Sequence, residues 1–218
     1  MEVWQQLIIL LEGVPLTLSI SLISFLIGIA IGLPIAFIRV YEKEISFIID
    51  AYEKIFRGVP EIVLMLMFYF GVGPFFPIPF SNPFFVAAFV LGLRSGANQS
   101  QIYRGAIRGV GDEQMIAGMS VGFSKWRSIW HIMVPQVFTY STPGLGSEYA
   151  LLIKDSAYVY VIGSLAEIMT LAIRLKSIPP YDVITPFVLA AILYIIITFP
   201  IAFFLDRWGN RMKNKIGL

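Results

Sequence analysis

The sequence predicts an all-α integral membrane protein, with about five transmembrane helices in a single domain over residues 1–218. Composition is the first observation: 57% of the residues are hydrophobic and 14% are charged, whereas soluble domains carry about 25% charged residues, and the mean hydropathy is +0.79. Length is the second, because 218 residues hold about five spans of roughly 20 residues once the loops are subtracted. The lipid bilayer is therefore the first expected partner.

The same composition argues against several functions. The net charge of +2 is too small to indicate nucleic-acid binding. The absence of cysteine excludes thiolate metal sites and cysteine nucleophiles, and a single histidine argues against a His-rich metal site. The chain contains no G-x-x-x-x-G-K-[ST] motif to cradle phosphates and no catalytic dyad. We therefore expect no cofactor, no metal and no enzyme activity in this chain.

The first half of the chain predicts two spans. An amphipathic helix over residues 1–11 is expected to lie in the membrane interface. The first span follows over residues 14–38, where small residues that allow close helix packing in lipid recur every fourth position: Ser24, Gly28, Gly32 and Ala36. Residues 39–57 are interpreted as a charged, partly helical cytoplasmic connection. The second span is expected over residues 61–71, with Pro60 in its first turn, before an outer loop rich in Pro and Phe. The alternative is that this span extends backwards into the preceding segment.

The third span, over residues 84–103, is interrupted by polar side chains. Arg94, Asn98 and Gln101 are spaced i, i+4 and i+7, so they share one helix face, while Gln99 lies on a neighbouring strip. A charged side chain at the bilayer centre costs about 2.5–3.5 kcal/mol on insertion scales, so Arg94 is expected to have a functional partner. This face is the strongest candidate to line a path through the membrane.

Residues 111–136 form a polar insert that predicts two short helices. Asp112 is the expected N-cap of the first helix, and Gly122 is expected to end it. Ser124 is expected to cap the second helix, whose apolar face extends from Trp126 until Pro135 ends it. The pattern predicts a helix, a glycine elbow and a helix built to contact another protein. The alternative is an ordinary amphipathic connector between membrane helices.

The distribution of basic residues predicts the orientation in the membrane. A fourth span is expected over residues 145–167 and a last one over residues 186–205, before a basic tail. Of sixteen basic residues, twelve fall on the side of the 111–136 insert: Arg39, Lys43, Lys54, Arg57, Arg104, Arg108, Lys125, Arg127, Arg207, Arg211, Lys213 and Lys215. By the positive-inside rule this side is cytoplasmic, which places the C-terminus in the cytoplasm and the N-terminus outside.

The 111–136 insert resembles the cytoplasmic signature loop of ATP-binding-cassette importer permeases. That family carries Glu-Ala-Ala, then Gly, then Ile-x-Leu-Pro, and the spacing of Ala117, Gly122, Ile132 and Pro135 is similar. Three positions depart from the pattern, with Ile116 in place of Glu, Gly118 in place of Ala and Val134 in place of Leu. Residues 57–61, 145–149, 152–156 and 161–167 resemble segments of the polar amino-acid branch of the same family.

The resemblance implies a type I importer permease fold like that of histidine, arginine and glutamine permeases, in a prokaryotic inner membrane. In that family the insert docks on the ATPase, and the implied coupling residues here are Ile116, Ala117, Gly118, Gly122, Phe123, Ser124 and Trp126. The implied partners are ATPase subunits that bind ATP and Mg²⁺, a second identical or homologous permease, an extracellular solute-binding protein and a polar amino acid.

The residues expected to line the substrate path come from two regions. Arg94, Asn98, Gln99 and Gln101 belong to the third span, and Glu148 and Glu167 belong to the fourth. The alternative for Glu148 and Glu167 is structural pairing, with Arg94 as the partner. Two other functions also stay open on the residues alone: an ion-coupled secondary amino-acid carrier, and a membrane scaffold that does not transport.

Overall fold

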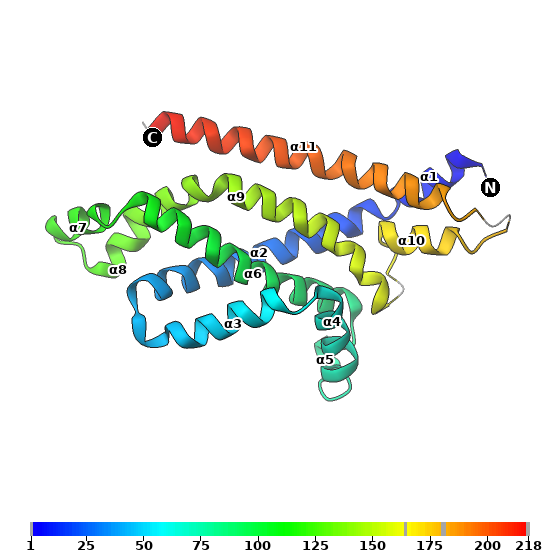
Figure 1. Cartoon of the computed structure of the whole chain (residues 1–218), viewed down its shortest axis with the longest axis horizontal. Coiled ribbons are helices and arrows are strands. Elements are labelled where there is room, and N and C mark those ends of the chain that lie inside the picture. Colours follow the sequence, from blue (N-terminus) through cyan, green and yellow to red (C-terminus); the bar gives the residue numbers. More distant parts are fainter. Residues whose placement is uncertain (1, 164, 180–181, 217–218) are drawn as a thin grey trace.

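The computed structural model describes residues 2–163, 165–179 and 182–216, and every regular element in this part of the chain is a helix. Four long helices, α2 (Val14–Tyr41), α6 (Pro83–Val110), α9 (Val134–Asp155) and α11 (Thr185–Ile216), run along the long axis of the molecule (Figure 1). A helix of 20 residues spans about 30 Å, so each of these helices is long enough to match a bilayer core. The helical prediction is confirmed.

Membrane-spanning character is clearest at the N-terminal end. Helix α1 (Val3–Leu11) leads into α2, and the run Val3–Tyr41 is long and apolar enough to cross a membrane. Helix α3 (Ser46–Gly58) and the stretch Glu61–Val72 are long and apolar enough only when taken together, with a bend of 103° between them. The other long helices are less uniformly apolar. Helix α6 holds the polar face of the predicted third span, and the apolar part of α11 is the shorter stretch Thr185–Ile201.

The small-residue stripe of α2 packs against α6. A Cβ atom added to Gly28 would lie 2.3 Å from Gln99 Nε2, and one added to Gly32 would lie 2.8 Å from the Gly96 carbonyl oxygen. The Ser24 hydroxyl donates to the Ala88 carbonyl across the same contact, at 3.2 Å. The close packing predicted from residues four apart is therefore confirmed, and it holds the polar face of α6 in a fixed position.

Helix α3 gives residues 39–57 the helical character that the sequence predicts, and it packs them into the bundle. After the 3-10 turn η1 (Lys43–Ile45), α3 packs along α6, and the Tyr52 hydroxyl donates to the Leu93 carbonyl at 2.6 Å. Its apolar residues Phe47 and Ile48 are 79% and 67% exposed, while Glu53 is buried. This inverted arrangement suits a helix in lipid, where polar groups turn toward the bundle interior.

The segment between α3 and α6 projects sideways from the bundle (Figure 1). It consists of α4 (Glu61–Leu66), the π-helix η2 (Met67–Val72) and the short α5 (Pro77–Phe80). Helix α6 then starts at Pro83 and is capped by Asn82, whose side chain accepts hydrogen bonds from the backbone N–H groups of Phe84 and Phe85. Because α6 continues to Val110, it is one to two turns longer than the predicted third span.

The prediction that Pro135 ends a helix is wrong. Helix α7 (Glu113–Ser120) is followed by α8 (Lys125–Ser128), the π-helix η3 (Ile129–Met133) and α9, and Pro135 lies in the first turn of α9. A proline has no N–H to donate, so the first turn of a helix tolerates it, and the wider π-helical turn precedes it. The second helix of the insert therefore continues directly into the bundle.

The fourth predicted span is displaced toward the N-terminus. Helix α9 covers Val134–Asp155, and the 3-10 helix η4 (Ser156–Val161) ends the helical run well before residue 167. Glu167 is the N-cap of a separate short helix, α10 (Ile168–Leu175), so it does not belong to a long span. Ser164, within the matching segment 161–167, lies outside the described residues.

Candidate functional site

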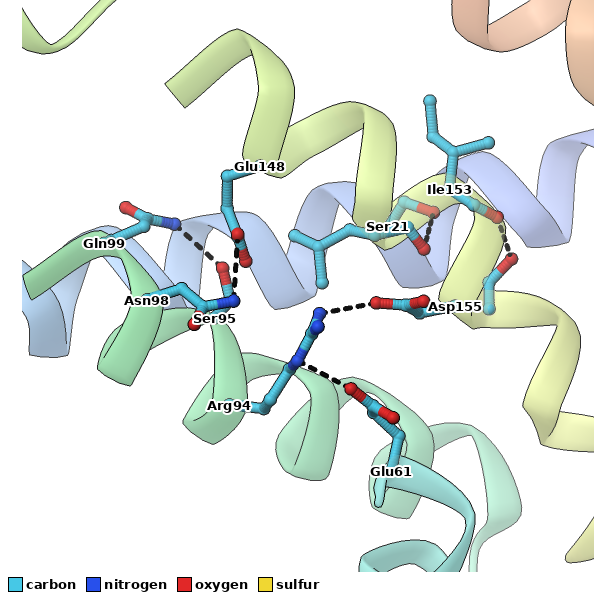
Figure 2. Close-up of polar contacts among 11 residues, drawn as sticks. Ser21, Glu61, Arg94, Ser95, Asn98, Gln99, Glu148, Ile153 and Asp155 are labelled. Atoms are coloured by element: carbon cyan, nitrogen blue, oxygen red, sulfur yellow. Dashed lines mark hydrogen bonds and ion pairs between the residues drawn. The ribbon is translucent and has the colours of Figure 1, made fainter. Parts of the chain in front are cut away.

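Arg94, from the middle of α6, forms two ion pairs inside the bundle. Its Nε lies 2.8 Å from Glu61 Oε1 on α4, and its Nη1 lies 2.5 Å from Asp155 Oδ2 at the end of α9 (Figure 2). The Arg94 side chain is 16% exposed. These partners are not Glu148 or Glu167, the acids expected for a structural pairing of Arg94. The Arg94 guanidinium thus links α6 to α4 and to α9. A lysine ammonium, which is a single point charge, would bind the two carboxylates less well.

Asn98 lies one turn farther along α6 and contacts a third acid of this region. Its Nδ2 donates to Glu148 Oε2 at 3.1 Å, and Glu148 is 3% exposed (Figure 2). We call Glu61, Arg94, Asn98, Glu148 and Asp155 the polar cluster. It holds three carboxyl groups and one guanidinium, so it has a negative balance when all are ionised.

Of the two glutamines of the predicted path, Gln99 lies beside this cluster through Ser95 (Figure 2), and Gln101 lies apart from it. Gln99 is fully buried between α2 and α6, where it donates to the Phe25 carbonyl and to Ser95 Oγ. Gln101 donates to Glu53 Oε2 on α3 at 2.7 Å. The single face expected from the spacing of Arg94, Asn98 and Gln101 therefore divides between two different sets of partners.

Glu53 is a buried acid that the sequence analysis did not single out. It accepts hydrogen bonds from Ser100 Oγ at 2.7 Å and from Arg104 Nη2 at 3.1 Å, and Arg39 Nη1 lies 3.5 Å away. Arg39 also pairs with Asp50. The sequence contained a signal for Glu53: a helix whose apolar side faces lipid must turn its carboxylate toward basic residues of neighbouring helices.

Glu167 occupies a local capping site. Its carboxylate accepts from the backbone N–H groups of Met169 and Thr170, at 2.5 Å and 3.3 Å, and from the Tyr194 hydroxyl on α11 at 2.5 Å. The residue is fully buried. These contacts connect the start of α10 to α11. None of the partners of Glu167 named here belongs to the polar cluster.

The insert 111–136, which we call the loop 111–136, forms the end of the molecule opposite to the N-terminus (Figure 1). Gly122 has φ +90°, a left-handed backbone conformation that is strained for any residue with a side chain. The space around Gly122 is open. Ser124 caps α8 by accepting from the Arg127 backbone N–H, as predicted, whereas Asp112 makes no side-chain cap. The predicted elbow is confirmed.

The two halves of the loop pack together at Gly118. A Cβ atom there would lie 2.6 Å from both Ile132 Cδ1 and Ser128 Oγ, so glycine permits the contact. The outer surface carries apolar side chains among polar ones, because Ile116 is 54% exposed and Trp126 is 45% exposed. Ala117 is also exposed, and Phe123 is half-buried. Exposed apolar groups on a polar loop are typical of a protein-protein contact.

Two side-chain contacts fasten the loop 111–136 to the end of α2. Lys125 Nζ lies 2.8 Å from Glu42 Oε1, and the Tyr41 hydroxyl donates to Asp112 Oδ1 at 3.1 Å. A displacement of the loop would consequently pull directly on α2.

Metal-ligating side chains do not gather in the part of the chain described. No group of three or more His, Cys, Asp or Glu residues there has the geometry to hold a metal ion.

Comparison with known proteins identifies the type of molecule that this architecture belongs to. Residues 24–214 match the family model described as "Binding-protein-dependent transport system inner membrane component". The nopaline transport system permease protein NocM of Agrobacterium fabrum is 31% identical, covering 95% of this chain and 91% of that protein. The glutamine transport system permease protein GlnP of Escherichia coli is 29% identical, covering 97% and 96%.

A solved structure has the same fold. It is described as "Crystal structure of an amino acid ABC transporter with histidines", and it superposes with a TM-score of 0.79 at 26% identity, covering 93% of this chain and 94% of that chain.

Proposed function

This chain belongs to the family of binding-protein-dependent transport system inner membrane components, and from that premise we propose that it forms the membrane path of an ATP-driven importer for polar amino acids. The relatives named for glutamine, arginine and nopaline transport support the substrate class. Family membership also decides against the two alternatives, an ion-coupled carrier and a scaffold without transport.

The observation that carries the proposal is the exposed apolar tip of the loop 111–136. Ile116 and Trp126 lie on a surface that the described part of this chain leaves uncovered, and the loop is fastened to α2 by Lys125 and Tyr41. An ATPase subunit that accepts this tip in a cleft would move α2 when it binds ATP. We therefore assign the loop as the coupling element, with ATP and Mg²⁺ held by the ATPase.

The proposed topology has about five spans, with the N-terminus outside and the C-terminus in the cytoplasm. These spans are α2, the bent pair of α3 and α4, α6, α9 and α11. Because α3 enters the bundle, Lys54 and Arg57 no longer count for either side, and ten of the sixteen basic residues remain on the side of the loop. The bias still supports a cytoplasmic loop.

The proposed mechanism is alternating access between two permease subunits, identical or homologous. ATP binding closes the ATPase pair, the loops follow, and the helix bundles turn to open outward while the external binding protein releases its solute. The close packing of α2 on α6 at Gly28 and Gly32 favours movement of these helices as one body, because neither can slide without a clash.

The polar cluster is the proposed lining of the path. An amino acid leaving water needs partners for its ammonium and carboxylate groups. The surplus of carboxylates in the cluster suits the ammonium, and we assign Glu148 on α9 and Asn98 on α6 as the groups that contact it. Arg94 already has two carboxylate partners, so a substrate carboxylate would have to displace Glu61 or Asp155 to reach it.

Reconstitution tests the proposal. The chain is purified with its ATPase, placed in vesicles, and supplied with its binding protein loaded with one amino acid at a time. We expect the ATPase to co-elute with the chain, and ATP hydrolysis to rise when the correct polar amino acid is present. Failure to co-elute with any ATPase would contradict the proposal.

A further inference from the structure

A long apolar groove on the side of the bundle has no role in the function proposed above. It has a volume of about 780 Å³ and lies between α2, α9 and α11. Leu22 and Phe25 line it from α2, Leu145 and Tyr149 from α9, and Pro200 and Phe204 from α11. Leu22 is 49% exposed and Phe204 is 71% exposed, so the groove opens to the surroundings of the bundle.

The groove offers almost no hydrogen-bonding groups to an occupant. Its threonines donate to carbonyl groups of their own helix: Thr139 to Pro135 at 3.2 Å, and Thr142 to Phe138 at 3.0 Å. Tyr149 packs edge-to-face on Phe25, with ring centroids 5.2 Å apart. An occupant must therefore be apolar along this part of its length.

Positive charge lies directly beyond one end of the groove. Pro200, Phe204, Arg207 and Arg211 are spaced i, i+4, i+7 and i+11, so they share one face of α11. By helical rise, Arg207 and Arg211 lie about 5 Å and about 10 Å beyond Phe204. Both arginines are exposed, and the Arg207 guanidinium lies 5.8 Å from the centre of the Phe203 ring.

We propose that this groove holds an acyl chain of an anionic phospholipid of the cytoplasmic leaflet, whose headgroup phosphate contacts Arg207 and Arg211. Apolar lining followed by two guanidinium groups along one helix face is the order of chemistry found in such a lipid, and basic sites at the cytoplasmic side of helix bundles suit anionic headgroups. The inference rests on the proposed function, because it requires that α11 spans the membrane with its C-terminus in the cytoplasm.

A helix of a second permease copy is the rival occupant, and the geometry disfavours it. Leu145 and Tyr149 line the groove, whereas Glu148 turns toward Asn98 on α6. A second copy that completes a translocation path must cover the polar cluster, which lies on that other side of α9. The groove then remains on the lipid side of the assembly.

The test uses the detergent-purified complex of the chain with its ATPase. Delipidated complex is titrated with dioleoyl phosphatidylglycerol or dioleoyl phosphatidylcholine, and the retained lipid is counted by native mass spectrometry. We expect tighter retention of phosphatidylglycerol. The variant Arg207→Gln/Arg211→Gln should lose about fivefold in affinity for each arginine, and should keep its weaker binding of phosphatidylcholine.

Two further variants complete the design. Arg108→Gln/Lys54→Gln removes two positive charges from other helices and should leave the preference intact. Ile29→Trp, which fills the groove from α2, should reduce the retention of both lipids alike.

The outcomes separate the inference from the proposed function. Equal retention of both lipids, or no effect of the double arginine variant, overturns the inference even though the ATPase co-elutes. A disulfide cross-link between cysteines placed at Leu22 of one copy and Phe204 of another would overturn it in favour of a protein occupant. Loss of ATPase co-elution in the wild-type preparation would instead count against the proposed function.

Discussion

The polar cluster and the loop 111–136 differ in where their side chains find partners. In the cluster, Arg94 meets Glu61 and Asp155, and Asn98 meets Glu148, all within this chain. In the loop, Ile116 and Trp126 remain exposed although they are apolar. The cluster is therefore part of what holds the bundle together, whereas the outer face of the loop has a use only in contact with a partner.

The comparison predicts that changes in the cluster reduce stability first. Arg94→Ala leaves Glu61 and Asp155 without their cation, and breaking a buried pair in this way costs about 3–5 kcal/mol. We expect the thermal midpoint of the purified complex to fall, and transport to fall with it. Arg94→Lys should recover only part of the loss, because an ammonium does not reproduce the two-sided fork.

A matched variant separates stability from substrate contact. Asn98→Ala removes a neutral group from the same face of α6, so it should lower solute-stimulated ATP hydrolysis with a smaller loss of stability than Arg94→Ala. If Arg94→Ala kept the wild-type midpoint and lost transport alone, Arg94 would serve the path without stabilising the bundle.

A change at the elbow of the loop should reduce coupling to the ATPase and leave the stability of the bundle intact. Gly122→Leu forces a branched side chain into a left-handed conformation, which costs about 1–2 kcal/mol locally, although the surrounding space is open. We expect normal membrane insertion and an unchanged bundle, but weak ATPase binding and no import. Gly58→Leu is the control, since that glycine also has open space but a helical backbone. Import by Gly122→Leu at the wild-type rate would remove the loop from the mechanism.

The contact between the loop and α2 should have a moderate effect. Lys125 and Glu42 are 37% and 42% exposed, so Lys125→Glu should change stability by no more than about 1 kcal/mol. It should nevertheless lower the number of solutes imported per ATP hydrolysed, because the loop then moves without α2. The exchange Glu42→Lys/Lys125→Glu should restore the ratio. An unchanged number of solutes imported per ATP in the single variant would show that the contact between Lys125 and Glu42 does not couple the loop to α2.

The smallest expected effect lies at the opposite end of the molecule. Hydrogen bonds from the side chain and backbone of Thr185 hold the pKa of the Asp182 carboxyl below its usual value. Because the folded pKa is lowered, the carboxylate stabilises the protein above its unfolded pKa of about 3.9, and this stabilisation is lost as the pH falls through the folded value. The difference in thermal midpoint between wild type and Asp182→Asn should therefore be constant from pH 5 to 8 and shrink below about pH 4. A difference that persists at pH 3 would contradict this.

The sequence predicted local features better than partners across helices. The glycine elbow at Gly122 and the cap at Ser124 depend on neighbouring backbone alone, and both were predictable. The partners of Arg94 were not, because Glu61 and Asp155 are brought to it by the bend between α3 and α4 and by the end of α9. Helical spacing indicates which side chains share a face, but it does not tell which helix lies opposite.

Two other differences have local physical causes. Pro135 was expected to end a helix, and a π-helical turn accommodates it instead. The resemblance of residues 161–167 to a permease segment places Glu167 in the fourth span, yet it caps α10 through the N–H groups of Met169 and Thr170. A carboxylate two residues before a free backbone N–H is a capping signal, and it could have been recognised in the sequence.

The most direct test of the contrast between the two regions is the accessibility of a single cysteine at Ile116. The chain has no cysteine of its own, so Ile116→Cys introduces the only thiol. Its reaction with a water-soluble maleimide is compared in complexes with and without the ATPase, and Glu44→Cys, also exposed but outside the loop, is the control. We predict that the ATPase slows labelling at position 116 at least tenfold, about 1.4 kcal/mol of protection, and leaves position 44 unchanged. Equal labelling of position 116 with and without the ATPase would contradict the assignment of the loop as the docking surface.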